Sequence, residues 1–113
     1  DIIEDKINIA EDFANKYKIT LVLKSADTII AAPNKKSYII NNGNTALSKG
    51  GSGDALTGLI ASFMAQGYNQ EESCILGAYI LGRSSEYAVI DSHPAVVSIT
   101  NIIKEYKKVF HEL

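Results

Sequence analysis

The strongest chemical signal in this 113-residue sequence is a glycine-rich segment, residues 41–54, that leads directly into an apolar helical pattern. The segment ends in Gly51-Ser52-Gly53-Asp54. The first N–H groups of a helix have no acceptor within the helix, and the helix dipole places positive potential there. Glycines let the backbone approach a ligand closely, so such a loop can bind phosphate. The segment therefore predicts an anion site formed by the backbone amides of Gly51, Ser52 and Gly53.

Asp54 lies in the first turn of that helix, next to the expected anion site. A carboxylate repels phosphate, so its place beside the anion site calls for a function. One such function is that of general base for a substrate hydroxyl. Taken alone, the Gly51–Asp54 sequence fits a structural role equally well. In that case Asp54 is a favourable acid in the first helical turn, and Gly50 to Gly53 form a flexible connector. Two other phosphate motifs are excluded, because Lys49 lacks the neighbours of a P-loop lysine and Leu56 replaces the last glycine of a dinucleotide-binding loop.

The remaining patterns describe an α/β chain that would position this segment. Apolar residues at helical spacing predict helices over residues 3–17, from about 55 to 67, from 69 to about 85 and from about 98 to 110. Runs of branched residues predict strands at 19–23, 28–32 and 37–40. The first strand is expected to be buried and parallel, and the other two to form a hairpin, so that the sheet is mixed. The expected order is one helix, three strands and three helices.

Local signals sharpen some of these boundaries. Gly67 is expected to end the second helix in the left-handed conformation, and Asn69 with Glu72 to form a capping box at the start of the third. Gly77 in the third helix predicts that a neighbouring helix approaches closely. Lys24 follows the first strand, at the place where open α/β sheets bind their ligands.

Composition excludes several classes of protein. The net charge is −2, with 46% apolar and 21% charged residues, which is typical of one globular domain and unlike a nucleic-acid-binding surface. The longest mainly apolar run, 74–82, is too short to cross a membrane. Cys74 cannot form an internal disulfide, which favours a cytoplasmic protein, and is expected to be a core residue. His93 and His111 have no partners at metal-ligand spacing, so no metal site is predicted.

Three stretches carry a family resemblance: the 43–61 stretch around the Gly-Gly-Ser-Gly-Asp loop, the tripeptide Ala65-Gln66-Gly67, and the 23–31 stretch with its Lys24 turn. Together with Gly77, Tyr79 and Gly82, they resemble the ADP/ATP-dependent NAD(P)H-hydrate dehydratases of the ribokinase-like superfamily. The sequence departs from that family's pattern at three positions, Ser25 (usually Gly), Thr45 (often Pro) and Leu81 (often His).

The resemblance implies a ribokinase-like three-layer α/β sandwich, of which residues 1–113 would be the C-terminal part of a single domain. It implies a lyase of nicotinamide nucleotide repair that phosphorylates the hydroxyl of hydrated NADH or NADPH and then eliminates phosphate. Asp54 would face the hydrated nicotinamide and act as base, with ADP or ATP as phosphoryl donor and Mg²⁺ shielding its phosphates. The residues implied at the adenine nucleotide are Lys24, Ser25, Ala26, Asp27, Thr28 and Gly53. Similar enzymes are often homotetramers, so a homo-oligomer is expected.

Two alternatives stay open at this point. The chain could be a small-molecule kinase of the same superfamily, acting on a vitamin precursor or a sugar, or a non-catalytic nucleotide-binding module. The sequence also begins without Met inside a helical pattern and is shorter than a ribokinase-like domain. We therefore expect a fragment that holds the nucleotide site and the catalytic acid but is inactive by itself.

Overall fold

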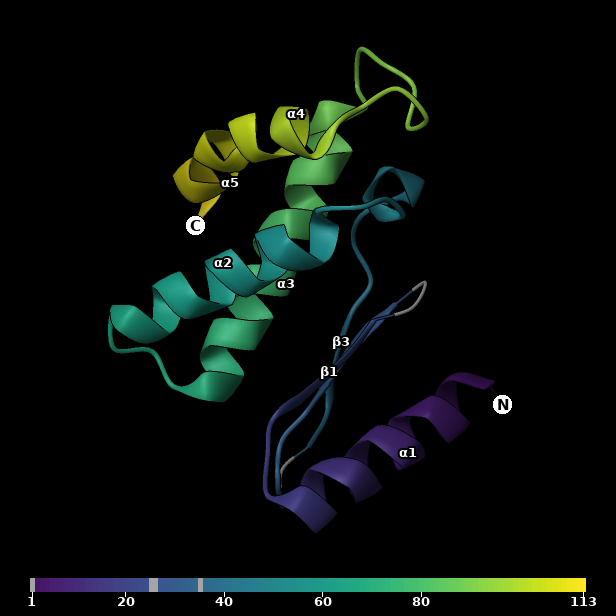
Figure 1. The fold of residues 1–113 in the computed structure, drawn as a ribbon, viewed down its shortest axis with the longest axis vertical. Helices are drawn as coiled ribbons and strands as arrows, with labels where there is room; N and C mark the ends of the chain where they lie inside the picture. The colour runs from purple at the N-terminus through teal and green to yellow at the C-terminus, as the bar shows by residue number, and fades with distance from the viewer. Residues whose placement is uncertain (1, 25–26, 35) are drawn as a thin grey trace.

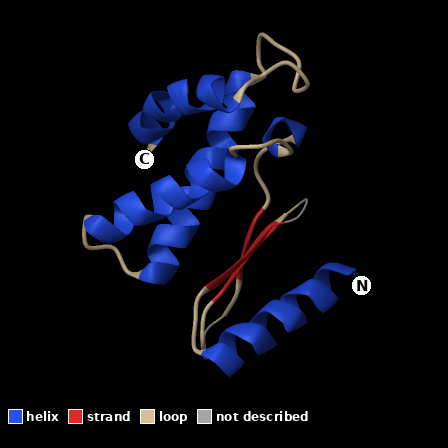
Figure 2. Ribbon diagram, in the orientation of Figure 1, coloured by secondary structure: helices blue, strands red, loops and turns tan. Residues whose placement is uncertain are grey.

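The computed structural model describes residues 2–24, 27–34 and 36–113. A small sheet lies between one helix at the N-terminus and a group of helices from the C-terminal half (Figures 1 and 2). The elements in chain order are α1 (Ile2–Tyr17), β1 (Leu21–Lys24), β2 (Thr28–Ala31), β3 (Tyr38–Ile40), the 3-10 turn η1 (Thr45–Leu47), α2 (Ser52–Ala65), α3 (Gln70–Ala88), α4 (Ile99–Lys104) and α5 (Tyr106–Glu112). Within the described residues, no helix is both long and apolar enough to span a bilayer.

The central strand β2 is buried on both faces. Successive side chains of a strand point to opposite sides, and here Ile29 and Ala31 join a cluster with Ala10 and Ala14 of α1. Ile30, which lies between them in sequence, belongs to a second and larger cluster on the other side. The chain therefore forms layers, with α1 on one face of the sheet and α3 on the other, as Figure 1 shows.

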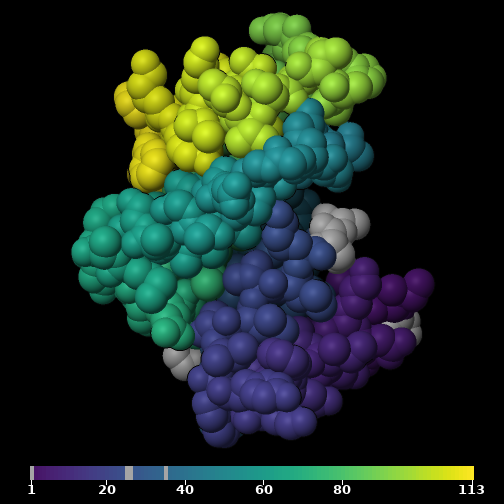
Figure 3. Space-filling model, viewed as in Figure 1, coloured from purple at the N-terminus to yellow at the C-terminus, as the bar shows by residue number. Residues whose placement is uncertain are grey.

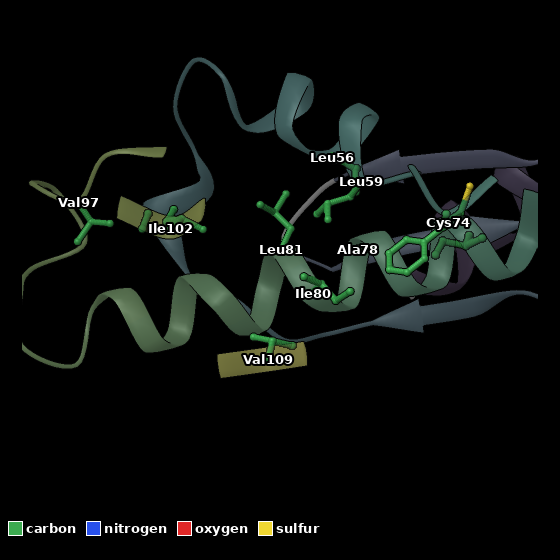
Figure 4. Close-up of a cluster of buried hydrophobic side chains, with 12 residues drawn as sticks. Leu56, Leu59, Cys74, Ala78, Ile80, Leu81, Val97, Ile102 and Val109 are labelled. Carbon is green, nitrogen blue, oxygen red and sulfur yellow. The ribbon is translucent and has the colours of Figure 1, made fainter. Parts of the chain in front are cut away.

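The larger cluster joins β2 to the four C-terminal helices. Its labelled members in Figure 4 lie on α3 and reach it from α2, α4 and α5, and Val97 reaches it from the segment before α4. Gly77 of α3 faces α2 directly, because a Cβ at this position would lie 3.0 Å from Cγ1 of Ile60. This confirms the close helix approach that Gly77 predicts. A larger side chain there would force α2 away from α3.

The sheet differs from the expectation in strand direction. Within the described residues, β1 and β2 pair antiparallel, with Leu21 opposite Ala31, and β2 and β3 also pair antiparallel, in the order β1-β2-β3. The predictions of a parallel first strand and a mixed sheet are therefore wrong for this part of the chain. The reason is the short connection between Lys24 and Thr28, since a parallel pair needs a long crossover. The residues of β1 are half-buried or exposed, not buried.

The helices also depart from the expected boundaries. The second helix starts at Ser52, before the expected position near Ala55. The expected last helix is divided into α4 and α5 at Glu105, whose N–H donates to the carbonyls of both Ile102 and Ile103. Four α-helices therefore follow the sheet where three were expected. The capping box of Asn69 and Glu72 is confirmed, and so is the left-handed Gly67, with φ of 101°.

Candidate functional site

A cavity of about 700 Å³ lies where the loop before α2 meets the ends of β1 and β2. Its size suits a small-molecule ligand. The lining residues are Lys24, Thr28, Asn42, Gly43, Asn44, Thr45, Leu47, Ser48, Lys49 and Ser52. Among the described residues, this lining carries two ammonium groups and no carboxylate, so the cavity favours an anionic ligand.

Lys24 and Ser52 bring the two predicted segments of the site together. The Lys24 ammonium, at the end of β1, donates to Oγ of Ser52 at 3.5 Å. Ser52 is the first residue of α2 and is only 5% exposed. The lysine turn and the glycine loop, 28 residues apart in sequence, are thus neighbours at one cavity. Thr28 also lines the cavity and Asp27 does not, while Ser25 and Ala26 lie outside the described residues.

Gly51 sets the direction in which α2 begins. It is the N-cap of α2 and has φ of 97°, a left-handed backbone conformation that residues other than glycine rarely adopt. The Gly51 carbonyl accepts the N–H of Ala55 at 3.0 Å. The N–H of Ser52 donates to the Lys49 carbonyl at 3.5 Å. The N–H groups of Gly53 and Asp54 belong to the first helical turn, whose donors have no acceptor within the helix and can bind a ligand. Gly51 and Gly53 are exposed.

Asp54 is exposed in the first turn of α2 and does not line the cavity. A helix turns by about 100° per residue, so Asp54 projects roughly opposite to Ser52, two positions earlier. The cavity and the Asp54 carboxylate therefore lie on different sides of the same helix N-terminus.

The wall of the cavity is fastened to α3 by three hydrogen bonds. The Asn42 side chain donates to the Tyr79 carbonyl at 3.0 Å, and the Asn44 side chain donates to the Ser85 carbonyl at 3.1 Å. The Gly43 N–H donates to Oε2 of Glu86 at 3.2 Å. These anchors lie outside the sequence-based assignment of site residues. The only hint of them in the sequence is the high asparagine and glycine content of residues 41–54.

Neither metal ligation nor a cysteine nucleophile finds support in the described part of the chain. No group of three His, Cys, Asp or Glu side chains in the described ranges could hold a metal ion. His93 is exposed, and its Nδ1 accepts the N–H of Ala95 at 3.0 Å. Cys74 lies in the larger hydrophobic cluster, where burial raises the pKa of its thiol and so disfavours the reactive thiolate.

Comparison with solved structures gives the fold class. The crystal structure of ADP/ATP-dependent NAD(P)H-hydrate dehydratase from Bacillus subtilis, co-crystallised with ATP and Mg²⁺, matches 98% of this chain with a TM-score of 0.91. The two sequences are 23% identical, and the match covers 40% of the Bacillus chain. This chain therefore has the α/β fold of the matching part of that enzyme, as expected.

Sequence comparison then gives the family. Residues 1–108 match the model of the NAD(P)H-hydrate dehydratase family, and the chain belongs to that family. It is 38% identical over 84 residues to the bifunctional NAD(P)H-hydrate repair enzyme Nnr of Dictyoglomus turgidum, covering 74% of this chain and 16% of that protein. It is 35% identical over 95 residues to the ADP-dependent (S)-NAD(P)H-hydrate dehydratase of Lactococcus lactis, covering 84% of this chain and 34% of that protein. The chain thus aligns with well under half the length of these relatives.

Proposed function

We propose that this chain takes part in the ADP- or ATP-dependent dehydration of hydrated NADH or NADPH, as the C-terminal part of one ribokinase-like domain. The observation that carries the proposal is the contact between Lys24 and Ser52 at the cavity, with Asp54 two residues further along α2. The relatives' names support this substrate and nucleotide, since they include an ADP-dependent (S)-NAD(P)H-hydrate dehydratase. A homo-oligomer and a cytoplasmic location remain predictions.

The cavity is the proposed nucleotide site. Lys24 and Lys49 supply positive charge on its wall, and none of the described lining residues is a carboxylate that would oppose a bound phosphate. The residues proposed to hold the nucleotide are Lys24, Ser25, Ala26, Asp27 and Thr28, with Gly53 at its phosphates. The first-turn amides of α2 would hold the phosphoryl group during its transfer. Mg²⁺ would neutralise charge on the nucleotide phosphates, but the described residues contain no ligand cluster of their own for it.

Asp54 is the proposed base. Its carboxylate, on the side of the helix away from the cavity, would take the proton of the hydrate hydroxyl. The hydroxyl oxygen then bonds to the terminal phosphorus of ADP or ATP, and the phosphorus–oxygen bond to the departing nucleotide breaks. In the second step the carbon–oxygen bond breaks and phosphate leaves with the electron pair. Loss of a proton from the neighbouring ring carbon restores the double bond of NADH or NADPH.

The test is recovery of the reduced-nicotinamide absorbance when the complete protein is mixed with hydrated NADH and either ADP or ATP. We expect recovery only with nucleotide present, and one equivalent of phosphate released per NADH formed. If a vitamin precursor or sugar is phosphorylated and no NADH is recovered, the protein is a small-molecule kinase and the proposal is wrong. Nucleotide binding with no turnover of any of these compounds would indicate a non-catalytic module. Residues 1–113 alone, assayed in parallel, are expected to be inactive.

A further inference from the structure

We infer that Lys49 is a positioning residue for this reaction, because it ties the glycine loop to the segment after α3 and so places the first turn of α2. This inference rests on the proposed function. Lys49 lies outside the first helical turn and precedes Asp54 by five positions. Its role would be to hold the loop and not to take part in bond making.

The contacts of Lys49 cross a long sequence separation. Its ammonium donates to the carbonyl oxygens of Pro94, at 3.1 Å, and of Val97. Both acceptors belong to the segment that leads into α4. In Figure 3 the blue-green surface around residue 50 lies directly below the yellow-green surface around residue 95. Hydrogen bonds from a charged donor are about twice as strong as neutral ones, so this is a firm link between two loops.

The same segment supports the glycine loop at a second point. A Cβ on Gly51 would lie 3.4 Å from Cγ1 of Ile99, so the first residue of α4 packs against the N-cap of α2. Gly50 lies between these two contacts, and a Cβ on it would meet nothing within 4 Å. A glycine-rich loop has little stiffness of its own. The position of Gly51–Asp54 therefore depends on the supports at Lys49 and Ile99.

Lys49 also lies at the cavity. Both acceptors are neutral carbonyls, and Lys49 lines the cavity together with Lys24. Two substitutions test these contacts. Lys49→Met keeps most of the aliphatic stem but removes donors and charge, whereas Lys49→Arg keeps both and can reach two carbonyls.

The experiment measures kcat and the KM for nucleotide in the complete protein. Displacing a catalytic group by about 1 Å can cost about a hundredfold in rate. We expect Lys49→Met to lower kcat by about ten- to a hundredfold and to raise KM by a smaller factor, and Lys49→Arg to recover kcat to within about threefold of wild type. Lys107→Met, an exposed lysine on α5, is the matched control and should leave both constants unchanged.

Two results would overturn the inference: wild-type kcat in Lys49→Met, or equal impairment in Lys49→Arg and Lys49→Met. If Lys49→Met does not fold, Lys49→Leu, which also lacks a donor, takes its place, and wild-type kcat in that variant counts against the tether in the same way. Amide hydrogen exchange separates this inference from the proposed function. Even if the wild-type protein does not dehydrate hydrated NADH, exchange over residues 50–56 should be faster in Lys49→Met than in Lys107→Met, and equal exchange rules the tether out.

Discussion

The backbone N–H of Gly43 donates to Oε2 of Glu86 at 3.2 Å, so a residue of the cavity wall is held by the carboxylate of a helix 43 positions away. The other oxygen of that carboxylate accepts from Arg83 at 3.1 Å. Arg83 also donates to Glu112 of α5 at 3.3 Å, and its hydrogen bonds to Glu112 and Glu86 raise the pKa of the guanidinium. A continuous set of polar contacts thus joins α5 to the cavity.

Replacing Glu86 should therefore weaken nucleotide binding, although Glu86 itself does not line the cavity. Glu86→Ala removes the acceptor of the half-buried Gly43 N–H, and such a hydrogen bond is worth about 0.5–1.5 kcal/mol. We expect a nucleotide Kd about five- to tenfold higher, measured by calorimetry on the complete protein. Glu86→Gln keeps one acceptor oxygen and should show a smaller increase. Equal affinity in Glu86→Ala and wild type would mean that the Gly43 contact does not shape the cavity.

Asp54→Asn tests the general base. The substitution keeps the size of the side chain and removes its basicity, so kcat should fall by about 10²- to 10⁴-fold. Nucleotide Kd should stay within about threefold of wild type, because Asp54 is exposed and does not line the cavity. Asp12→Asn, an exposed carboxylate on α1, is the control. Unchanged turnover would remove Asp54 from the mechanism, and joint loss of binding and turnover would make its role structural.

Lys24→Met tests the charge at the cavity. If the Lys24 ammonium binds phosphate, its removal should raise nucleotide Kd about tenfold or more. The affinity of the variant should also depend less on salt concentration than that of wild type, because one charge pair is lost. Lys104→Met, at an exposed position on α4, should change neither quantity. A salt dependence identical in Lys24→Met and wild type would place the phosphates elsewhere.

How far the sequence could predict this structure depends on the range of each interaction. The N-cap at Asn69 and the left-handed turn at Gly67 are decided by residues within a few positions, and both are confirmed. The direction of β1 depends on which strand it pairs with, and a run of branched residues carries no information about that partner. The links of Lys49 to Val97 and of Gly43 to Glu86 join residues 48 and 43 positions apart. No local pattern encodes contacts of that length, so the loop could be recognised while its supports could not.

Tyr106 offers a test of stability against pH. Its hydroxyl is buried and has no hydrogen-bond partner within the described residues, and burial raises its pKa. Tyr106→Phe removes an unsatisfied group and should increase the free energy of unfolding by about 1 kcal/mol at pH 7. A raised pKa in the folded state means that wild type loses stability as pH rises above about 10, the pKa of unfolded tyrosine. Urea unfolding at pH 7 and above pH 10 should show the variant's advantage growing with pH, and a constant difference would contradict this.

Gly82 marks the closest approach of α3 to the cavity wall. A Cβ at this position would lie 2.1 Å from Oδ1 and 3.0 Å from the backbone oxygen of Asn42. Asn42 cannot move away freely, because its side chain donates to the Tyr79 carbonyl at 3.0 Å. Gly82→Ala should therefore lower the free energy of unfolding by about 1–3 kcal/mol in urea titrations. It should also weaken nucleotide binding, since Asn42 lines the cavity.

The matched control for Gly82→Ala is Gly58→Ala in α2, where a Cβ would meet nothing within 4 Å. That substitution should stabilise the protein by about 0.5–1 kcal/mol, because alanine loses less backbone entropy in a helix than glycine. If both variants gain stability, helix propensity outweighs the contact with Asn42, and Asn42 can shift to make room for the new methyl group. If Gly82→Ala loses stability and nucleotide affinity together while Gly58→Ala loses neither, the close packing of α3 against Asn42 shapes the cavity.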